Sequence, residues 1–141
     1  MRSSARNQFF GTVSAVTAGA VTDEIEIAVD GGHRIVATVT RESTAKLGLA
    51  VGAAAFALIK ASSVVVVADA DLTLLSARNQ FAGTVASVQP GAVNAEVEID
   101  AGGLRIVAIV TQASARALGL GPGAKASAVF KAGSVIVGVR R

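Results

Sequence analysis

The hexapeptide Ser-Ala-Arg-Asn-Gln-Phe occurs twice in the chain, at Ser4–Phe9 and at Ser76–Phe81. The two copies start 72 residues apart (76 − 4 = 72) in a chain of 141 residues. The residues that follow each copy also match, so the repeat extends over the whole chain and predicts two similar domains. We expect these domains at residues 1–68 and 76–141, joined by a linker at 69–75.

Each repeat has the residue pattern of a small all-β domain. Glu24–Ile27 alternates polar and apolar residues, as a half-buried strand does. Further strands are expected at 34–40, 55–60 and 63–67, which are rich in β-branched or small apolar residues. Helical segments are expected at Ser43–Leu47 and Ser114–Leu118, each ended by a glycine.

These short strands and one short helix per repeat predict two tandem OB-like five-stranded barrels. A barrel of this size buries only a modest share of its surface and is marginally stable alone. The apolar residues, 52% of the chain, are mostly Ala and Val. We therefore expect the barrels to pack into an oligomer.

The composition excludes several classes of function. The chain has no cysteine, which excludes disulfides and thiolate metal sites, and its single histidine, His33, cannot form a transition-metal site alone. A net charge of +3 and few aromatic residues do not favour nucleic acid as a partner. No apolar run reaches the roughly 18 residues of a membrane span, and the polar start lacks a signal peptide's apolar region. We expect a soluble cytoplasmic protein.

Charged residues are kept at five positions in both repeats, namely Arg6/Arg78, Glu24/Glu96, Glu26/Glu98, Arg34/Arg105 and Lys60/Lys131. Arg6 and Lys60 lie beside small residues, which expose backbone N–H groups and let a ligand approach closely. An Arg fork, a Lys point charge, hydroxyls and free N–H groups together suit a compact oxyanion. In the alternative interpretation, Arg6 pairs with Glu24 or Glu26 of a neighbouring strand and Lys60 is solvated.

The hydroxyl pair Thr40-x-x-Ser43, repeated as Thr111-x-x-Ser114, also has two interpretations. The threonine hydroxyl can cap the helix that follows by accepting a hydrogen bond from a backbone N–H. The two hydroxyls can instead hold an anion together with the helix N-terminal amides. Both hold if Thr40 caps the helix while Ser43 binds the anion.

The carboxylates Glu24 and Glu26 lie two residues apart and so share one face of a strand. Such a pair can perform acid–base chemistry. No histidine or nucleophile accompanies them, and a solvated face or a salt bridge explains them better. The chain also lacks a metal cluster or cofactor fingerprint, so we do not expect an enzyme.

Taken together, these motifs resemble those of the molbindins, the small molybdate-binding Mop domains. The resemblance rests on Ser-Ala-Arg-Asn-Gln, the Gly-Ala-Val turn, Thr-x-x-Ser before Leu-Gly-Leu, and Lys-Ala-Ser/Gly-Ser-Val, in the same order in both repeats. A tandem pair resembles the di-domain molbindins of bacteria. The resemblance implies OB-like barrels assembled as a homotrimer, with molybdate or tungstate bound as the intact oxyanion at interfaces between barrels.

The resemblance also implies the site residues by position. One wall is the Ser-Ala-Arg segment of one barrel, and the other comes from the Thr-x-x-Ser turn, a basic position three residues later, and the Lys-Ala strand. In this chain these are Ser4, Ala5, Arg6, Thr40, Ser43, Lys46, Lys60, Ala61, Ser62, Ser76, Ala77, Arg78, Thr111, Ser114, Lys131 and Ala132. The counterpart of Lys46 is Ala117, so the second-repeat sites are expected to differ. A second class of site, on the three-fold axis, would use Gly19, Ala20, Val21, Gly91, Ala92 and Val93.

The function implied is intracellular molybdenum storage and homeostasis, with no other cofactor and no direct protein ligand to the metal. An oxyanion-sensing regulatory module that acts through a protein partner is the alternative, and a purely structural β-oligomer is a third. Direct gene regulation is not expected, because no residues remain for a DNA-binding helix-turn-helix.

Overall fold

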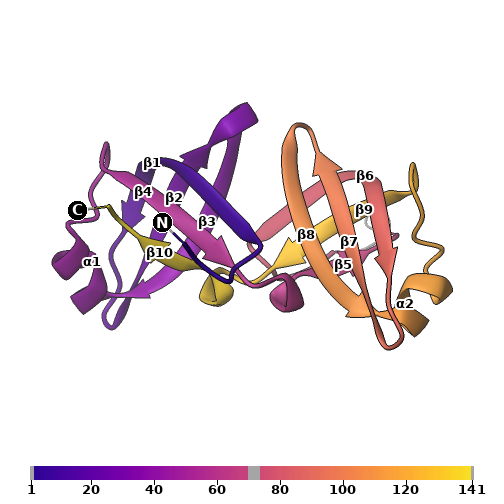
Figure 1. Cartoon of the computed structure of the whole chain (residues 1–141). Helices are drawn as coiled ribbons and strands as arrows, with labels where there is room; N and C mark the ends of the chain where they lie inside the picture. Colours follow the sequence, from indigo (N-terminus) through magenta and orange to yellow (C-terminus); the bar gives the residue numbers. More distant parts are fainter. Residues whose placement is uncertain (1, 70–73, 141) are drawn as a thin grey trace. The chain divides into compact units, whose positions relative to one another are not determined.

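The computed structural model describes residues 2–69 and 74–140, so that part of the expected linker, residues 70–73, lies outside the described residues (Figure 1). The described residues form two five-stranded antiparallel sheets. The first has the order β10-β4-β1-β2-β3, with β1 at Asn7–Thr17, β2 at Thr22–Val29, β3 at His33–Thr40, β4 at Ala54–Ile59 and β10 at Ile136–Gly138. The second has the order β5-β9-β6-β7-β8, with β5 at Val65–Val67, β6 at Asn79–Pro90, β7 at Asn94–Ala101, β8 at Leu104–Thr111 and β9 at Lys125–Phe130.

Short helices connect these strands. They are α1 at Arg41–Leu47, α2 at Gln112–Ala117, and the 3₁₀ turns η1 at Asp30–Gly32, η2 at Ala61–Ser63 and η4 at Ala132–Ser134. Gly48 and Gly119 follow α1 and α2 with φ of 65° and 63°, a left-handed conformation that suits glycine. The predicted all-β class and short helices are therefore confirmed. Among the described residues, no helix is long and apolar enough to cross a membrane.

Each sheet is curled, as in an OB-like barrel, and buries one face (Figure 1). Ile25 and Ile27 of β2 are fully buried, while Glu24 and Glu26 on the same strand lie on the outer face. Their counterparts Val97 and Ile99, and Glu96 and Glu98, repeat this arrangement. The alternating pattern therefore predicts the buried face correctly in both repeats.

The last strand of each sheet comes from the other repeat. β10, near the end of the second repeat, pairs with β4 of the first, with Val137 opposite Ala57. β5, near the end of the first repeat, pairs with β9 of the second, with Val66 opposite Ala128. The chain accordingly divides into a first unit, Met1–Ile59 with Lys131–Arg141, and a second unit, Lys60–Phe130.

These units differ from the expected domains, 1–68 and 76–141, in the segments that follow Ile59 and Phe130. Ala57 and Ala128 present the same small side chain to the incoming strand, and β5 and β10 are both three-residue apolar strands. Either last strand thus fits beside either partner, and the hydrophobic pattern does not distinguish the two pairings.

The turn after β4 corrects two smaller predictions. Lys60 lies outside β4, and Ala61 begins the 3₁₀ turn η2, so the expected Lys-Ala strand ends at Ile59. The strand expected at 63–67 is reduced to Val65–Val67 because η2 takes up its start.

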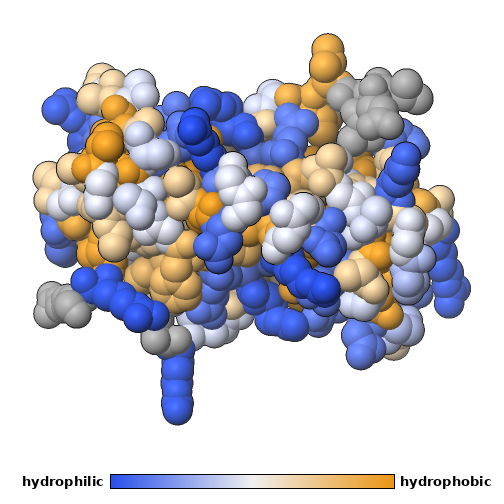
Figure 2. All heavy atoms as spheres, turned by 90° about the horizontal axis from the view of Figure 1, so that it is seen from above, coloured by the Kyte–Doolittle hydropathy of each residue, from blue (hydrophilic) through white to orange (hydrophobic). Residues whose placement is uncertain are grey.

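Apolar side chains remain exposed at matching places in both repeats. Val21 and Val93, at the tips of the β1–β2 and β6–β7 hairpins, are 75% and 72% exposed. Val65 and Ile136, which begin the exchanged strands, are 58% and 62% exposed. Figure 2 shows apolar residues, coloured orange, mixed with polar ones on the face that it views.

Candidate functional site

The Ser-Ala-Arg segment is held in place by the two residues that follow it in the hexapeptide. The Gln8 side-chain amide donates a hydrogen bond back to the Ala5 carbonyl at 3.0 Å. The Asn7 amide, almost completely buried, donates to the Ile59 carbonyl at 3.2 Å and fixes the start of β1 to the end of β4. The Gln80 amide donates to the Ala77 carbonyl at 2.8 Å in the second repeat.

The repeated hexapeptide therefore has two parts with different tasks. Asn7 and Gln8 shape and anchor the segment, whereas Ser4 and Arg6 remain exposed and can meet a ligand. The sequence analysis assigned no role to the asparagine and glutamine. The sequence signal for this structural role is that the same asparagine and glutamine occur in both repeats, whereas a side chain that contacts only solvent is free to vary.

The Thr-x-x-Ser turn forms a hydrogen-bonded box. Thr40 Oγ1 accepts a hydrogen bond from the Ser43 backbone N–H at 3.1 Å, so the predicted cap is confirmed. Thr40 Oγ1 also donates to Ser43 Oγ at 2.8 Å. Because that oxygen already accepts, the Ser43 hydroxyl proton can point outward and donate to an anion. Thr111 and Ser114 form the same box, at 3.0 Å and 2.7 Å.

The basic residues beside this turn differ between the repeats. Lys46 lies one helical turn after Ser43 on α1 and is exposed. The matching residue of α2 is Ala117, and Arg116 beside it projects from a different side of the helix. α1 and α2 have only seven and six residues, so fixed side-chain charge matters more here than the helix dipole.

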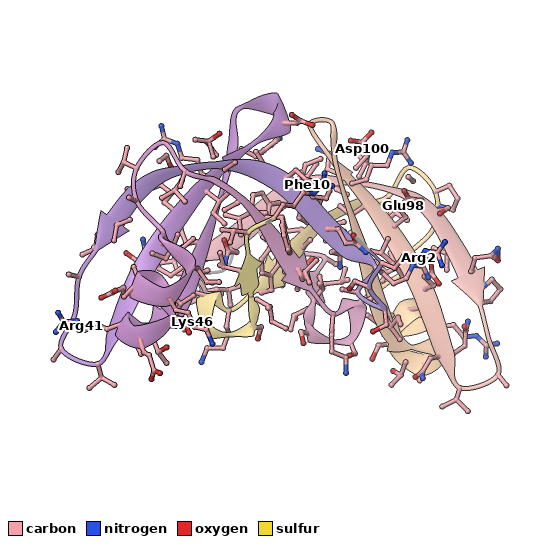
Figure 3. All side chains as sticks on the ribbon, turned by 60° about the vertical axis from the view of Figure 1, so that its left-hand side comes forward. Arg2, Phe10, Arg41, Lys46, Glu98 and Asp100 are labelled. Atoms are coloured by element: carbon pink, nitrogen blue, oxygen red, sulfur yellow. The ribbon has the colours of Figure 1, made fainter. Side chains whose placement is uncertain are left out.

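The predicted residues of the first unit lie at opposite ends of its sheet. β1 begins directly after Arg6, and its last residue, Thr17, pairs with Glu24 near the start of β2. Thr22, at that same end, pairs with Thr40, where α1 begins. The eleven residues of β1 span roughly 30 Å. Figure 3 likewise shows Lys46 on α1 well away from Arg2 in the N-terminal segment.

Because the last strands are exchanged, the residues expected to form the second wall of one site belong to different units. The sequence analysis placed Lys60 and Ala61 on the barrel that carries Thr40 and Ser43. In the structure Lys60 begins the second unit, and η2, which includes Ala61 and Ser62, lies against β8. Correspondingly, η4 with Ala132 lies against β3 of the first unit. The structure groups these residues differently from the expected domains, because β4 and the turn after it belong to different units.

Asp23 is a buried carboxylate that the sequence analysis did not single out. It is 5% exposed, and its Oδ1 accepts a hydrogen bond from the Gly19 N–H at 3.1 Å. This bond, a hydrogen bond with the Thr44 side chain and the charge of Arg41 hold the pKa of Asp23 below its ordinary 3.8, although burial opposes the shift. The carboxylate thus joins the Gly19–Val21 turn to α1.

Two of the acids that are kept in both repeats, Glu26 and Glu98, form salt bridges on the outer face of the sheets. Arg34 pairs with Glu26 at 2.9 Å, and Arg105 pairs with Glu98 at 3.2 Å. Both pairs are solvent-exposed and contribute little to stability. Across the part of the chain that the structure describes, no three His, Cys, Asp or Glu side chains gather as a metal-binding group.

Two open hollows of about 360 Å³ lie at matching places in the two units. Phe10, Phe56 and Arg140 line the hollow of the first unit, and Thr84, Lys125 and Ser127 are among the residues that line the other. No predicted site residue lines either hollow. The polar candidate residues, such as Arg6, Lys46 and Lys60, lie instead on exposed surfaces, whereas Ala61 and Ala132 are buried.

Comparisons with known proteins agree with this architecture. A family model described as the TOBE domain matches residues 3–66 and 75–137. The molybdenum-pterin-binding protein MopA of Rhodobacter capsulatus is 46% identical over 138 residues, which are 97% of this chain and 52% of MopA. The molybdenum transport protein ModE of Herbaspirillum seropedicae is 45% identical over 142 aligned positions, covering 100% of this chain and 53% of ModE. The chain thus spans about half the length of these curated relatives.

A solved structure matches over its full length. It is a crystal structure of the cytoplasmic molybdate-binding protein ModG with molybdate bound, with a TM-score of 0.95 and 48% sequence identity, and the match covers 99% of this chain and 100% of that one. The family model thus matches both repeats, and the fold matches that of ModG. The chain belongs to the TOBE-domain family, with the tandem pair of domains typical of a molbindin, as the repeated hexapeptide predicts.

Proposed function

We propose that the chain binds molybdate as the intact oxyanion and serves in the storage and homeostasis of molybdenum. The observation that carries this proposal is the match, over 99% of the chain, to ModG, a protein whose crystal structure contains molybdate. Tungstate, which is nearly the same size and carries the same charge, is expected to bind as well. The proposed role requires no catalysis and no other cofactor.

The chemistry of the candidate residues fits this ligand. Molybdate is a dianion at neutral pH, and burying it requires fixed positive charge and hydrogen-bond donors. Arg6 supplies a planar fork of donors, Lys60 or Lys131 a point charge, and Ser43 an outward hydroxyl proton. The chain has no cysteine, which fits an oxyanion held by hydrogen bonds and not by thiolate ligands.

We further propose that these sites are completed by assembly. One oxyanion is only a few ångströms across, whereas Arg6 and Ser43 of one unit are separated by the length of β1. A site that uses both residue types must therefore combine the Ser-Ala-Arg segment of one barrel with the Thr-x-x-Ser turn of a second barrel, and we place this second barrel in another subunit. The exposed Val21 and Val93 support burial against other copies, and we propose a homotrimer.

The similarity to ModE proteins, of which that of Yersinia pestis is described as a transcriptional regulator, makes an oxyanion-sensing regulatory module the second candidate. The two roles share the ligand and differ in the partner. A storage protein binds molybdate alone, whereas a sensing module also binds a protein when molybdate is present. We favour storage because ModG, which is described only as a molybdate-binding protein, is matched over 100% of its chain, whereas ModE is matched over 53% of its length. The description of ModG as cytoplasmic supports the same location for this chain.

Native mass spectrometry with molybdate, and with sulfate as the matched control, tests the proposed function. The expected result is a trimer that carries several molybdate ions and retains none of the sulfate ions at equal concentration. Failure to bind molybdate, or equal binding of sulfate, would refute the proposal. A pulldown from lysate with and without molybdate separates storage from sensing, since only a sensing module gains a partner with the ligand.

A further inference from the structure

The first unit contains a polar bridge between its hairpin turn and its helix. Asp23 accepts a hydrogen bond from the Gly19 N–H in the turn at 3.1 Å. On its other side it lies beside Thr44 and Arg41 of α1, which both hold the pKa of the carboxyl low, and the Thr44 hydroxyl donates to the Thr40 carbonyl at 3.2 Å. The Arg41 backbone N–H donates to the Val21 carbonyl at 3.1 Å and links the same two segments. The turn that holds Gly19–Val21 and the helix that holds Ser43 are thus connected at two points.

The second unit keeps the backbone link and lacks the polar bridge. The Gln112 N–H donates to the Val93 carbonyl at 2.8 Å, as Arg41 does to Val21. Asp23 and Thr44, however, are replaced together by Ala95 and Ala115, which are both buried. Both of these neighbouring polar residues have changed to alanine, so their contact is a paired feature of the first unit.

The start of α2 shows a second difference between the units. Gln112, which stands at the place of Arg41, has its side-chain oxygen Oε1 buried without a hydrogen-bond partner among the described residues. Gly91 takes the same close approach to Asn94 that Gly19 takes to Thr22, so the two turns have the same shape. The units differ in how their turns are held and not in how they are folded.

We propose that Asp23 is a positioning residue that couples the Gly19–Val21 turn to helix α1, and so to the Ser43 hydroxyl, in the first repeat only. A seven-residue helix is marginal by itself and depends on contacts with its surroundings. When α1 is fixed to the turn, Ser43 is already held in place, so an anion loses less binding free energy in ordering it. The inference rests on the proposed function where it concerns molybdate, and it makes the first-repeat sites tighter than the second-repeat sites.

Amide hydrogen exchange, read by NMR, tests the coupling without any ligand. Three variants are compared with the parent protein: Asp23→Ala, Asp23→Asn, which keeps a hydrogen-bond acceptor, and the double change Ala95→Asp with Ala115→Thr, which introduces the bridge into the second unit. In Asp23→Ala the Gly19 and Ser43 amides are expected to exchange about tenfold faster, with Gly91 and Ser114 unchanged. Asp23→Asn is expected to restore most of the protection, and the double variant to slow Gly91 and Ser114.

Unchanged exchange at Gly19 and Ser43 in Asp23→Ala would overturn the coupling. A uniform rise across both units would also overturn it, because that result indicates general destabilisation. Molybdate titration of the same variants then measures the effect on binding: Asp23→Ala is expected to weaken one class of sites about tenfold and leave the other unchanged. If the parent protein binds no molybdate, the proposed function fails, while the exchange comparison still decides the role of Asp23.

Discussion

Ile136 of the last strand pairs with Leu58 of β4, although the two residues come from different repeats. In the same way, Val65 pairs with Val129. Each unit therefore obtains its edge strand from the other repeat, and neither repeat contains all the strands of its own sheet. The duplication is thus built into the folding of each unit, because each sheet is complete only when both repeats are present.

The exchanged strands predict where a destabilising substitution takes effect. Val137→Asp places an unpaired charge at a position that is 8% exposed and opposite Ala57, and we expect it to destabilise the first unit by at least about 2 kcal/mol. Hydrogen exchange should show lost protection in β4, at Ala57 and Leu58, while β9 stays protected. Val66→Asp is the matched variant and should expose β9 instead. Loss of β9 protection in Val137→Asp would mean that each repeat forms its own barrel.

The hexapeptide predicts a separation of stability from binding. Asn7→Ala removes a buried amide from the Ile59 carbonyl and should cost about 1–3 kcal/mol in the free energy of unfolding. Arg6→Ala changes an exposed side chain and should alter stability by less than about 0.5 kcal/mol while weakening molybdate binding. Chemical denaturation and titration of both variants test this. Equal loss of stability in the two variants would contradict the division of tasks.

The buried carboxylate predicts a pH dependence of stability. The folded-state pKa of Asp23 lies below its ordinary 3.8, so the ionised group stabilises the fold at pH values above 3.8, and this stabilisation is lost as the pH falls through the folded-state pKa. Asp23→Asn should therefore be less stable than the parent near neutral pH, and the difference should shrink in acid. Denaturant unfolding at a series of pH values measures it, with Ala95→Asp as the second-unit comparison. If the difference in the free energy of unfolding between Asp23→Asn and the parent protein is the same at all pH values, the charge of Asp23 does not stabilise the fold.

The loss of Lys46 in the second repeat predicts unequal sites. Lys46→Ala should weaken molybdate binding at one class of sites by about tenfold, since one fixed charge near a dianion is removed. The reciprocal change Ala117→Lys should strengthen the other class by a similar factor. Calorimetric titration of both variants resolves the two classes. If neither substitution changes the affinities, the exposed end of α1 does not face the oxyanion.

Local chemistry in the sequence predicts much of this molecule. The alternation at Glu24–Ile27 indicates the buried face, Thr40-x-x-Ser43 indicates the cap, and the repeated motifs taken together identify the family. The pairing of β10 with β4 could not be predicted, because matching residues in the two repeats make both pairings chemically equivalent. The regrouping of Lys60 with the second unit follows from that pairing, so it was missed for the same reason.

The contact between Asp23 and Gly19 illustrates a different limit. The two residues are close in sequence, but their hydrogen bond depends on the shape of the hairpin turn and on the place of α1 beside β2. The useful signal was the joint change of Asp23 and Thr44 to alanine. It acquires meaning only when the two side chains are known to meet.

The central claim is that molybdate is held by the Ser-Ala-Arg segment of one barrel and the Thr-x-x-Ser turn of a barrel in another subunit. Anomalous diffraction at the molybdenum absorption edge, from crystals grown with molybdate, tests it most directly because it locates the metal. We expect molybdenum peaks bordered by Arg6 or Arg78 of one subunit and by Ser43 or Ser114 of another. Peaks far from these arginines, or molybdenum coordinated directly by protein carboxylates, would contradict it.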